Sequence, residues 1–352
     1  MKKLLTKLRK KDIPDGSSRI TNETVAEHRE KILAGGRRFK YPVQYARHKL
    51  VFNAIIISIA ALIVVGVVGW WQLYPAQNTS TFVYRVTRVV PLPVASVDGY
   101  MVPYSDYLMR YQGAARFLEQ QEGISLKSDD GKRQIEFYRQ SELKNAIDDA
   151  YAAKIAKERN ITVSDAELEA TLRSQRQSTS GEISQATQEA SILSRFGWSA
   201  DEYRQLVKSA LLRQKVEYAI DDDAAAASNT LNPQVKAAGA NFQSVVTAFN
   251  GTNPVVQAVY GAPGWVPKTN QDGGLAAVAA TLAKGQVSEK VMSTKGDGYY
   301  FIRLVDSNDT QVNYEYVQIP LTQFQKKIAE LEKANKIKRF ITIPVTSSEQ
   351  QS

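Results

Sequence analysis

The chain has 352 residues, no cysteine and only two histidines, His28 and His48. The absence of cysteine excludes disulfides, thiol nucleophiles and cysteine-ligated metals. Residues 1–49 hold 14 Lys+Arg against 5 Asp+Glu, which accounts for the whole net charge of +9. Because this basic surplus belongs to one short segment, we expect no nucleic-acid partner.

The uncharged run 50–73, LVFNAIIISIAALIVVGVVGWWQL, predicts one transmembrane helix. Its 24 residues reach about 36 Å as a helix, enough for a hydrocarbon core of about 30 Å. A cleaved signal peptide fits less well, because the basic region and the apolar run are both too long. The residues expected at the two membrane interfaces are Arg47, Lys49, Trp70, Trp71 and Tyr74.

The charge asymmetry predicts a single-pass protein of the cell membrane with residues 1–49 in the cytoplasm and 75–352 outside it. In the basic tail we expect one short helix that begins near Asn22 and stops at Gly35-Gly36. The lipid bilayer is then a partner. The basic clusters of the tail either bind anionic lipid headgroups or act only as a topology signal.

Segment 74–99 is predicted to be a linker followed by an extended stretch, because 82–99 is rich in valine and contains Pro91 and Pro93. Residues 100–220 have helical periodicity, with a polar loop near 174–190. Two capping boxes, SDAE at 164–167 and SADE at 199–202, each predict the start of a helix.

A shift in composition at 221–233, DDDAAAASNTLNP, predicts a second linker. The acidic run Asp221 to Asp223 could bind a divalent cation, but such runs in linkers are usually solvated, and we expect no metal and no cofactor.

Residues 234–310 are expected to form a small α+β domain. The sequence predicts a helix around Phe242 to Phe249, a long Gly/Pro loop before GWVP, and a helix that stops at Gly285. We expect 311–345 to form a strand, an amphipathic helix and a strand, and 346–352 to be a polar tail.

The strand after the turn at Gly296 to Gly298 has two distinct faces. Alternation places Tyr300, Ile302 and Leu304 on one face, and Tyr299, Phe301 and Arg303 on the other. A phenol at position 300 is therefore expected to point into a core.

Three stretches of the helical region resemble the N-terminal domain of SurA-like and PrsA-like extracytoplasmic foldases: VASVDGYMVPYSDYLMRY, NAIDDAYAAKIAKERNITVSDAELEATL and GWSADEYRQLVKSALLRQKVEYAI. The segment YGAPGWVPKTNQDGGLAAVAATLAKGQVSEKVMSTKGDGYYFIRLVD is similar to the second half of a parvulin-type prolyl isomerase domain. The resemblance implies an α+β membrane-anchored folding factor, a chaperone or holdase for unfolded or newly exported polypeptides.

The chemistry that parvulins use implies two histidines beside the rotating amide, and this chain departs from that pattern. Tyr300 stands where the histidine of the closing strand is expected, and 224–238 has neither a histidine nor a strand pattern. Gln271 and Leu275 take the places of the usual Met and Phe of the proline pocket. We therefore expect weak or absent isomerase activity, with the Tyr300 ring packed and its hydroxyl hydrogen-bonded.

Three alternatives stay open. An altered pocket using Tyr300 could still be an active isomerase, since the barrier is conformational. The chain could instead be a membrane-anchored scaffold or assembly subunit with one dedicated partner. Finally, VNYEYVQIP at 312–320 resembles a parvulin first strand and could supply that strand from the C-terminal side.

The candidate peptide-binding residues are apolar or aromatic for the most part, since such side chains adapt to varied partners. The alternative for each is that it packs in a core. In the helical domain they are Met101, Met109, Phe117, Leu118, Phe137 and Tyr138, and in the parvulin-like domain they are Trp265, Gln271, Leu275 and Tyr300.

Overall fold

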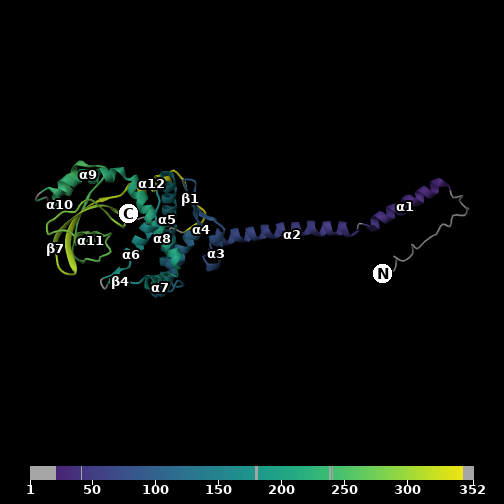
Figure 1. The fold of residues 1–352 in the computed structure, drawn as a ribbon, viewed down its shortest axis with the longest axis horizontal. Helices are drawn as coiled ribbons and strands as arrows, with labels where there is room; N and C mark the ends of the chain where they lie inside the picture. Colours follow the sequence, from purple (N-terminus) through teal and green to yellow (C-terminus); the bar gives the residue numbers. More distant parts are fainter. Residues whose placement is uncertain (1–20, 41, 179–180, 238, 240, 344–352) are drawn as a thin grey trace. The chain divides into compact units, whose positions relative to one another are not determined.

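The computed structural model describes residues 21–40, 42–178, 181–237, 239 and 241–343. The chain divides into two compact units, Met1–Gln72 and Leu73–Ser352, shown in Figure 1. The side chain of Arg47 and the tail 346–352 lie outside the described residues.

Two helices, α1 (Asn22–Lys40) and α2 (Pro42–Leu73), make up the described part of the first unit. The prediction that α1 stops at Gly35-Gly36 is wrong, because the helix continues through both glycines to Lys40. A glycine costs a helix only about 1 kcal/mol, so the pair does not by itself end it. Within the described residues, His48–Leu73 is the one stretch long and apolar enough to cross a membrane.

The helical part of the second unit is built from long helices around one apolar core, with a small three-stranded sheet of order β2-β1-β9 at its side. Both predicted capping boxes are present, at Ser164 with Glu167 and at Ser199 with Glu202. The helices are α3 (Thr81–Val89), α4 (Tyr104–Gln120), α5 (Asp129–Arg159), α6 (Asp165–Ser174), α7 (Gln185–Phe196) and α8 (Ala200–Ile220), and the strands are β1 (Pro93–Val97), β2 (Tyr100–Pro103) and β9 (Ile337–Arg339).

Two expectations for the helical part need correction. Residues 81–89 form the helix α3 and are not extended, because the Ser80 hydroxyl caps its start and Val83, Tyr84 and Thr87 pack inward. The predicted polar loop 174–190 is also shorter than expected. It contains the hairpin of β3 (Gln177–Ser178) and β4 (Gly181–Glu182), after which Ser184 caps α7.

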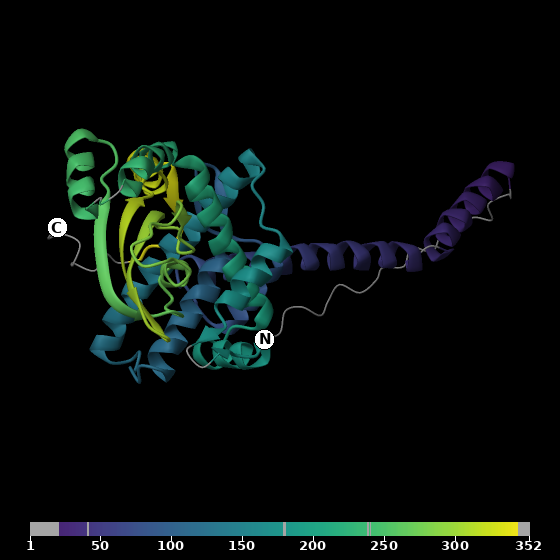
Figure 2. The ribbon, with the colours of Figure 1, turned by 60° about the vertical axis from the view of Figure 1, so that its left-hand side comes forward.

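The sheet part of the second unit is a four-stranded antiparallel sheet of order β5-β8-β7-β6, visible in Figure 2. Two helices pack against one of its faces and a short helix against the other. The helices are α9 (Asp222–Lys236), α10 (Phe242–Thr252) and α11 (Leu275–Ala279), and the strands are β5 (Val259–Pro267), β6 (Val291–Met292), β7 (Gly298–Ser307) and β8 (Gln311–Pro320).

Strand β7 has the two faces that its alternation predicted. Tyr300, Ile302 and Leu304 pack with α11, whereas Tyr299 and Phe301 pack with α9 and α10. β8 lies directly beside β7, so the segment VNYEYVQIP does supply a strand from the C-terminal side.

Three other predictions for this part are wrong. Residues 222–236 form helix α9 where a linker was expected, and 259–267 form strand β5 where a Gly/Pro loop was expected. The helix expected to stop at Gly285 ends at Ala279. For β5, edge position explains the difference, because a proline that cannot donate a hydrogen bond is tolerated in a strand with one neighbour.

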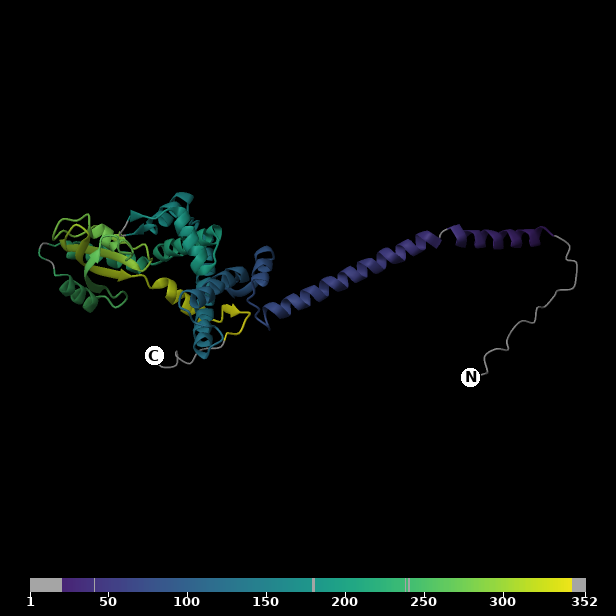
Figure 3. The ribbon, with the colours of Figure 1, turned by 90° about the horizontal axis from the view of Figure 1, so that it is seen from below.

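The C-terminal strand, helix and strand exist as predicted, but they do not form a unit of their own. β8 belongs to the large sheet, whereas α12 (Gln323–Lys333) buries Phe324 and Ile328 in the core of the helical part. β9 pairs with β1. Figure 3 shows the yellow C-terminal segment running from the sheet back to the blue helices. The sheet part is therefore inserted between α8 and α12.

Candidate functional site

The turn between β6 and β7 is docked on helix α8. The Tyr218 hydroxyl donates to the carbonyl oxygens of Gly298 at 2.6 Å and Ser293 at 3.1 Å. Gln214 Nε2 donates to the same Ser293 oxygen at 2.7 Å. Gly296 has a φ of +76°, and a Cβ there would lie 3.0 Å from a carboxylate oxygen of Glu217. The glycines of this turn thus let the sheet part approach α8 closely.

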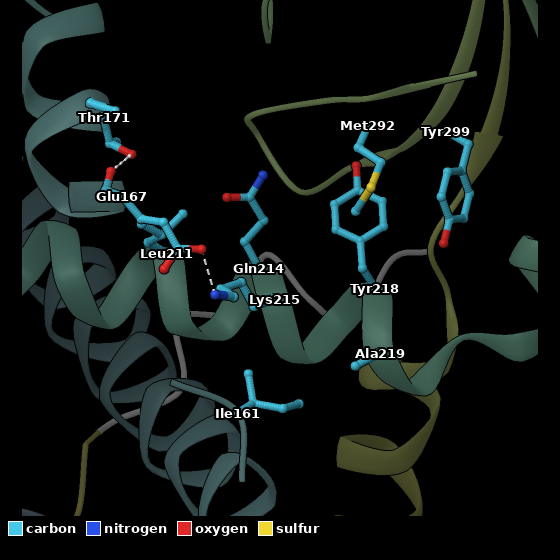
Figure 4. Close-up of a pocket in the computed structure, with 11 residues that line it drawn as sticks. Ile161, Glu167, Thr171, Leu211, Gln214, Lys215, Tyr218, Ala219, Met292 and Tyr299 are labelled. Atoms are coloured by element: carbon cyan, nitrogen blue, oxygen red, sulfur yellow. Dashed lines mark hydrogen bonds and ion pairs between the residues drawn. The ribbon is translucent and has the colours of Figure 1, made fainter. Parts of the chain in front are cut away.

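A groove of about 680 Å³ opens beside this contact, between α6, α8 and the edge of the sheet. Figure 4 shows Glu167 and Thr171 on α6 at one end and Tyr299 on β7 at the other. The volume is within the range of about 300–1,000 Å³ common for ligand sites. Its apolar lining consists of Ile161, Ala170, Leu211, Tyr218, Ala219, Met292 and Tyr299.

The polar end of the groove is an ion pair that is satisfied within the protein. Lys215 Nζ donates to Glu167 Oε1 at 2.6 Å and to the carbonyl oxygen of Thr162 at 2.7 Å. Lys215 and the capping contacts of Ser164 lower the pKa of Glu167 to about 2. Glu167 is therefore ionised at neutral pH and the pair carries no net charge.

The aromatic side of the groove carries no charge. Burial raises the pKa of Tyr218, so its phenol stays protonated and acts as a donor. The ring meets that of Tyr299 edge-on, with centroids 5.1 Å apart. Met292 stands at the rim with 53% of its surface exposed. With no histidine or cysteine in its lining, the groove fits apolar burial and hydrogen bonding better than acid–base chemistry.

Tyr300 lies on the opposite face of β7, in a separate buried cluster with Leu275. Its hydroxyl donates to Asp297 Oδ2 at 3.1 Å, and its ring packs edge-on against Tyr316 at 5.3 Å. The prediction of a packed ring and a bonded hydroxyl is confirmed. Burial raises the pKa of Tyr300, so the phenol is protonated at neutral pH.

Tyrosines fill the space around Tyr300. The Tyr314 hydroxyl donates to Asp272 Oδ2 at 2.7 Å, and Asp272 in turn accepts from the backbone N–H of Ala276 in α11. Gly261 on β5 lets the Tyr316 ring approach, since a Cβ there would lie 2.3 Å from that ring. The region where a parvulin-like proline pocket is expected is thus packed with aromatic rings.

The structure does not bring the ten sequence-predicted peptide-binding candidates together into one surface. Met109, Leu118, Leu275 and Tyr300 are buried, and Phe117 and Tyr138 are half-buried. Phe117 stacks on Phe196 with ring centroids 5.5 Å apart. The exposed candidates lie on different elements, and they are Met101 on β2, Phe137 on α5, Trp265 on β5 and Gln271 before α11.

Sequence reasoning missed the residues that line the groove. A signal for part of it was present: the apolar stripe of α8 that includes Val207 and Leu211 continues at helical spacing to Gln214 and Tyr218. Met292 and Tyr299 gave no such signal, because their place in the groove depends on the sheet docking against α8.

The acidic run at the start of α9 is part of the structure's own hydrogen bonding. Asp221 is buried, accepts from Ala224 N at 2.9 Å as the cap of α9, and accepts from Thr322 N at 2.6 Å. It is therefore not a solvated linker residue. Among the described residues, no group of three or more His, Asp or Glu side chains is placed to hold a metal ion.

A long-helix core joined to a small sheet, with an apolar groove beside the joint, fits the class of polypeptide-binding folding factors. Residues 44–217 match the family model of the SurA-like N-terminal domain. The chain therefore carries a SurA-like N-terminal domain, as its sequence predicted, and this points to a chaperone-type foldase family. The match ends before the sheet part, and no curated protein matches the chain.

Proposed function

We propose that the protein is a membrane-anchored, extracytoplasmic holdase that binds unfolded or newly exported polypeptides in the groove between α6, α8 and the sheet edge. The observation that carries this proposal is the apolar groove lined by Tyr218, Met292 and Tyr299, next to a SurA-like N-terminal domain. An extended apolar segment would lie across the rings, while Gln214 and the exposed rim offer hydrogen bonds to its backbone.

The membrane anchor in this proposal is the span His48–Leu73 of α2. Its mean hydropathy of 2.8 and its 26 residues support a single crossing. Trp70 and Trp71 are exposed near its C-terminal end, as expected of an interfacial belt. By the positive-inside rule, the basic tail supports a cytoplasmic N-terminus, and it also supports binding of anionic headgroups there.

The sheet part serves in this proposal as the structural wall of the groove and has little or no isomerase activity. Its order, with β8 between β5 and β7, supports a parvulin-like sheet whose first strand comes from the C-terminal side. The buried tyrosines around Tyr300 leave no histidine pair beside a substrate amide. This part would thus hold the client without rotating its prolyl bonds.

The holdase proposal is tested by dilution of several chemically unfolded clients into full-length protein held in detergent micelles, with light scattering as the readout. We expect suppression of aggregation near stoichiometric ratio. Met292→Lys, which puts a charge at the rim of the groove, should weaken suppression for every client.

Met101→Lys is the matched control, because Met101 on β2 is 57% exposed and lies outside the groove. It should leave suppression unchanged. If Met101→Lys weakened suppression of aggregation and Met292→Lys did not, the client site would lie in the helical part near β2 and not in the groove. No suppression for any client, with tight capture of one native protein, would favour the scaffold alternative.

The anchor and its orientation are tested separately, with protease added to the outside of intact cells whose wall has been removed. Residues 75–352 should be digested and a fragment containing the tail and the span should be spared. Protection of the large C-terminal unit would reject the proposed orientation.

A further inference from the structure

Helix α3 carries an apolar stripe on its outer side as well as an apolar face toward the core. Phe82, Val86 and Val89 follow one another at positions i, i+4 and i+7, which places them on one side of the helix. They are 75%, 40% and 83% exposed. The inward side is already occupied by Val83 and Tyr84, so the outer stripe is not needed for folding of the helical part.

Positive charge borders this α3 stripe. Arg85 is exposed one turn after Phe82, and at 100° per residue it falls at the edge of the stripe. Arg88 lies further round the helix and pairs with Glu202 at 3.3 Å. An apolar stripe with a cationic border is the pattern of a helix that lies in the interface of a bilayer.

The chain itself holds α3 close to the end of the apolar span. Seven residues, 74–80, separate Leu73 from Thr81, so the two are less than about 30 Å apart however the link is arranged. Tyr74, the first of these residues, packs its ring edge-on against Phe340, which is itself 39% exposed. One exposed apolar side chain, Phe340, thus lies beside the first residue after the span.

From these observations we infer that α3 is an interfacial helix, with Phe82, Val86 and Val89 inserted into the outer leaflet and Arg85 at the phosphate level. The inference rests on the proposed anchor, since the span is what keeps α3 at the lipid surface. Insertion of the stripe fixes the side of the second unit that faces the membrane.

The absence of cysteine from the chain makes the experiment direct. Full-length Val86→Cys, labelled with an environment-sensitive fluorophore, is reconstituted in phosphatidylcholine vesicles with and without nitroxide-labelled lipid. The matched control is Val305→Cys in β7, because Val305 is 41% exposed, almost the same as Val86. We expect a blue shift and lipid quenching at position 86 and neither at position 305.

A second variant separates insertion from mere proximity. Phe82→Ser with Val89→Ser, in the Val86→Cys background, should abolish the shift and the quenching while the protein still floats with the vesicles. Persistence of the signal in this variant would overturn the role of the stripe. So would flotation with a position-86 signal equal to that of position 305, or a signal that appears with an unfolded client and not with vesicles. Failure to float would instead reject the anchor on which the inference rests.

Discussion

The hydroxyl of Tyr218, at the end of α8, donates to the backbone carbonyl of Gly298, at the start of β7, over 2.6 Å. Both residues are buried, and they are 80 positions apart in the sequence. This contact joins the helical part to the sheet part at the edge of the groove.

Removal of that hydroxyl should loosen the joint. Tyr218→Phe leaves the Gly298 carbonyl without this donor, and we expect the free energy of unfolding to fall by about 1–3 kcal/mol. Chemical denaturation of the full-length protein in micelles measures the change. Tyr203→Phe, whose hydroxyl bonds the exposed Gln175 at 2.6 Å, should cost less than about 1 kcal/mol. Equal costs would mean that the joint contributes no more than a surface contact.

The turn itself should not tolerate a side chain at Gly298. Its φ is +151°, and a Cβ would lie 2.3 Å from the carbonyl oxygen of Ile319 on β8. Backbone strain should therefore make Gly298→Ala less stable by about 1–3 kcal/mol, and the contact with Ile319 acts in the same direction. Gly251→Ala in α10 is the control, because its Cβ meets nothing within 4 Å, and it should stabilise by up to about 1 kcal/mol. Thermal unfolding of both variants measures the two changes, and equal melting temperatures for Gly298→Ala and wild type would contradict the prediction.

Glu217 should make stability depend on pH. Burial raises its pKa to about 7, although Arg213 opposes the shift, and the nearby Asp148 and Asp149 add to it. The folded state therefore binds the proton more tightly than the unfolded chain, whose carboxyl has the ordinary value of 4.5. Protonation of Glu217 therefore stabilises the folded state fully below about pH 4.5, and this stabilisation is lost as the pH rises through about 7.

Glu217→Gln should remove this dependence. The difference in melting temperature between the variant and wild type should increase in favour of the variant as the pH rises from 5 to 7.5. Glu169→Gln changes an exposed carboxylate on α6, and its melting curve should stay parallel to that of wild type. A Glu217→Gln curve that is also parallel to wild type would contradict the prediction.

Tyr300 should have no role in catalysis. Spontaneous exchange of a prolyl bond takes tens to hundreds of seconds, so even a small acceleration of a proline tetrapeptide is measurable. Both wild type and Tyr300→Phe should leave the rate at its spontaneous value, and the variant should lose about 1 kcal/mol of stability with its hydrogen bond to Asp297. Acceleration by wild type that the variant lacks would identify the phenol as catalytic.

Local signals in the sequence were sufficient where one element carries its own evidence. The serine and glutamate of each capping box marked the starts of α6 and α8, and the alternation of β7 identified both buried faces. Burial of Tyr300 followed from the same alternation. These features depend only on neighbours in the chain.

Some of the elements that were predicted wrongly depend on contacts with residues distant in the sequence. Another carries a local signal that the prediction overlooked. α3 is rich in valine, which favours strands, and the Ser80 cap together with packing against the core makes it a helix. β5 contains two prolines, Pro263 and Pro267, and two glycines, yet pairing with β8 holds it extended. α9 gave a usable signal that was missed, since Asp221 is a good N-cap and the four alanines after Asp223 are strong helix formers. The groove needed the docking of the whole sheet part, which no local pattern specifies.

Asp221 and Thr322 mark the two points where the chain passes between the helical part and the sheet part, and they are hydrogen-bonded to each other at 2.6 Å. Residues 222–321 are therefore a contiguous insertion whose first and last residues lie next to each other. If this segment were removed, the two remaining ends could be rejoined at that point, because they already meet there.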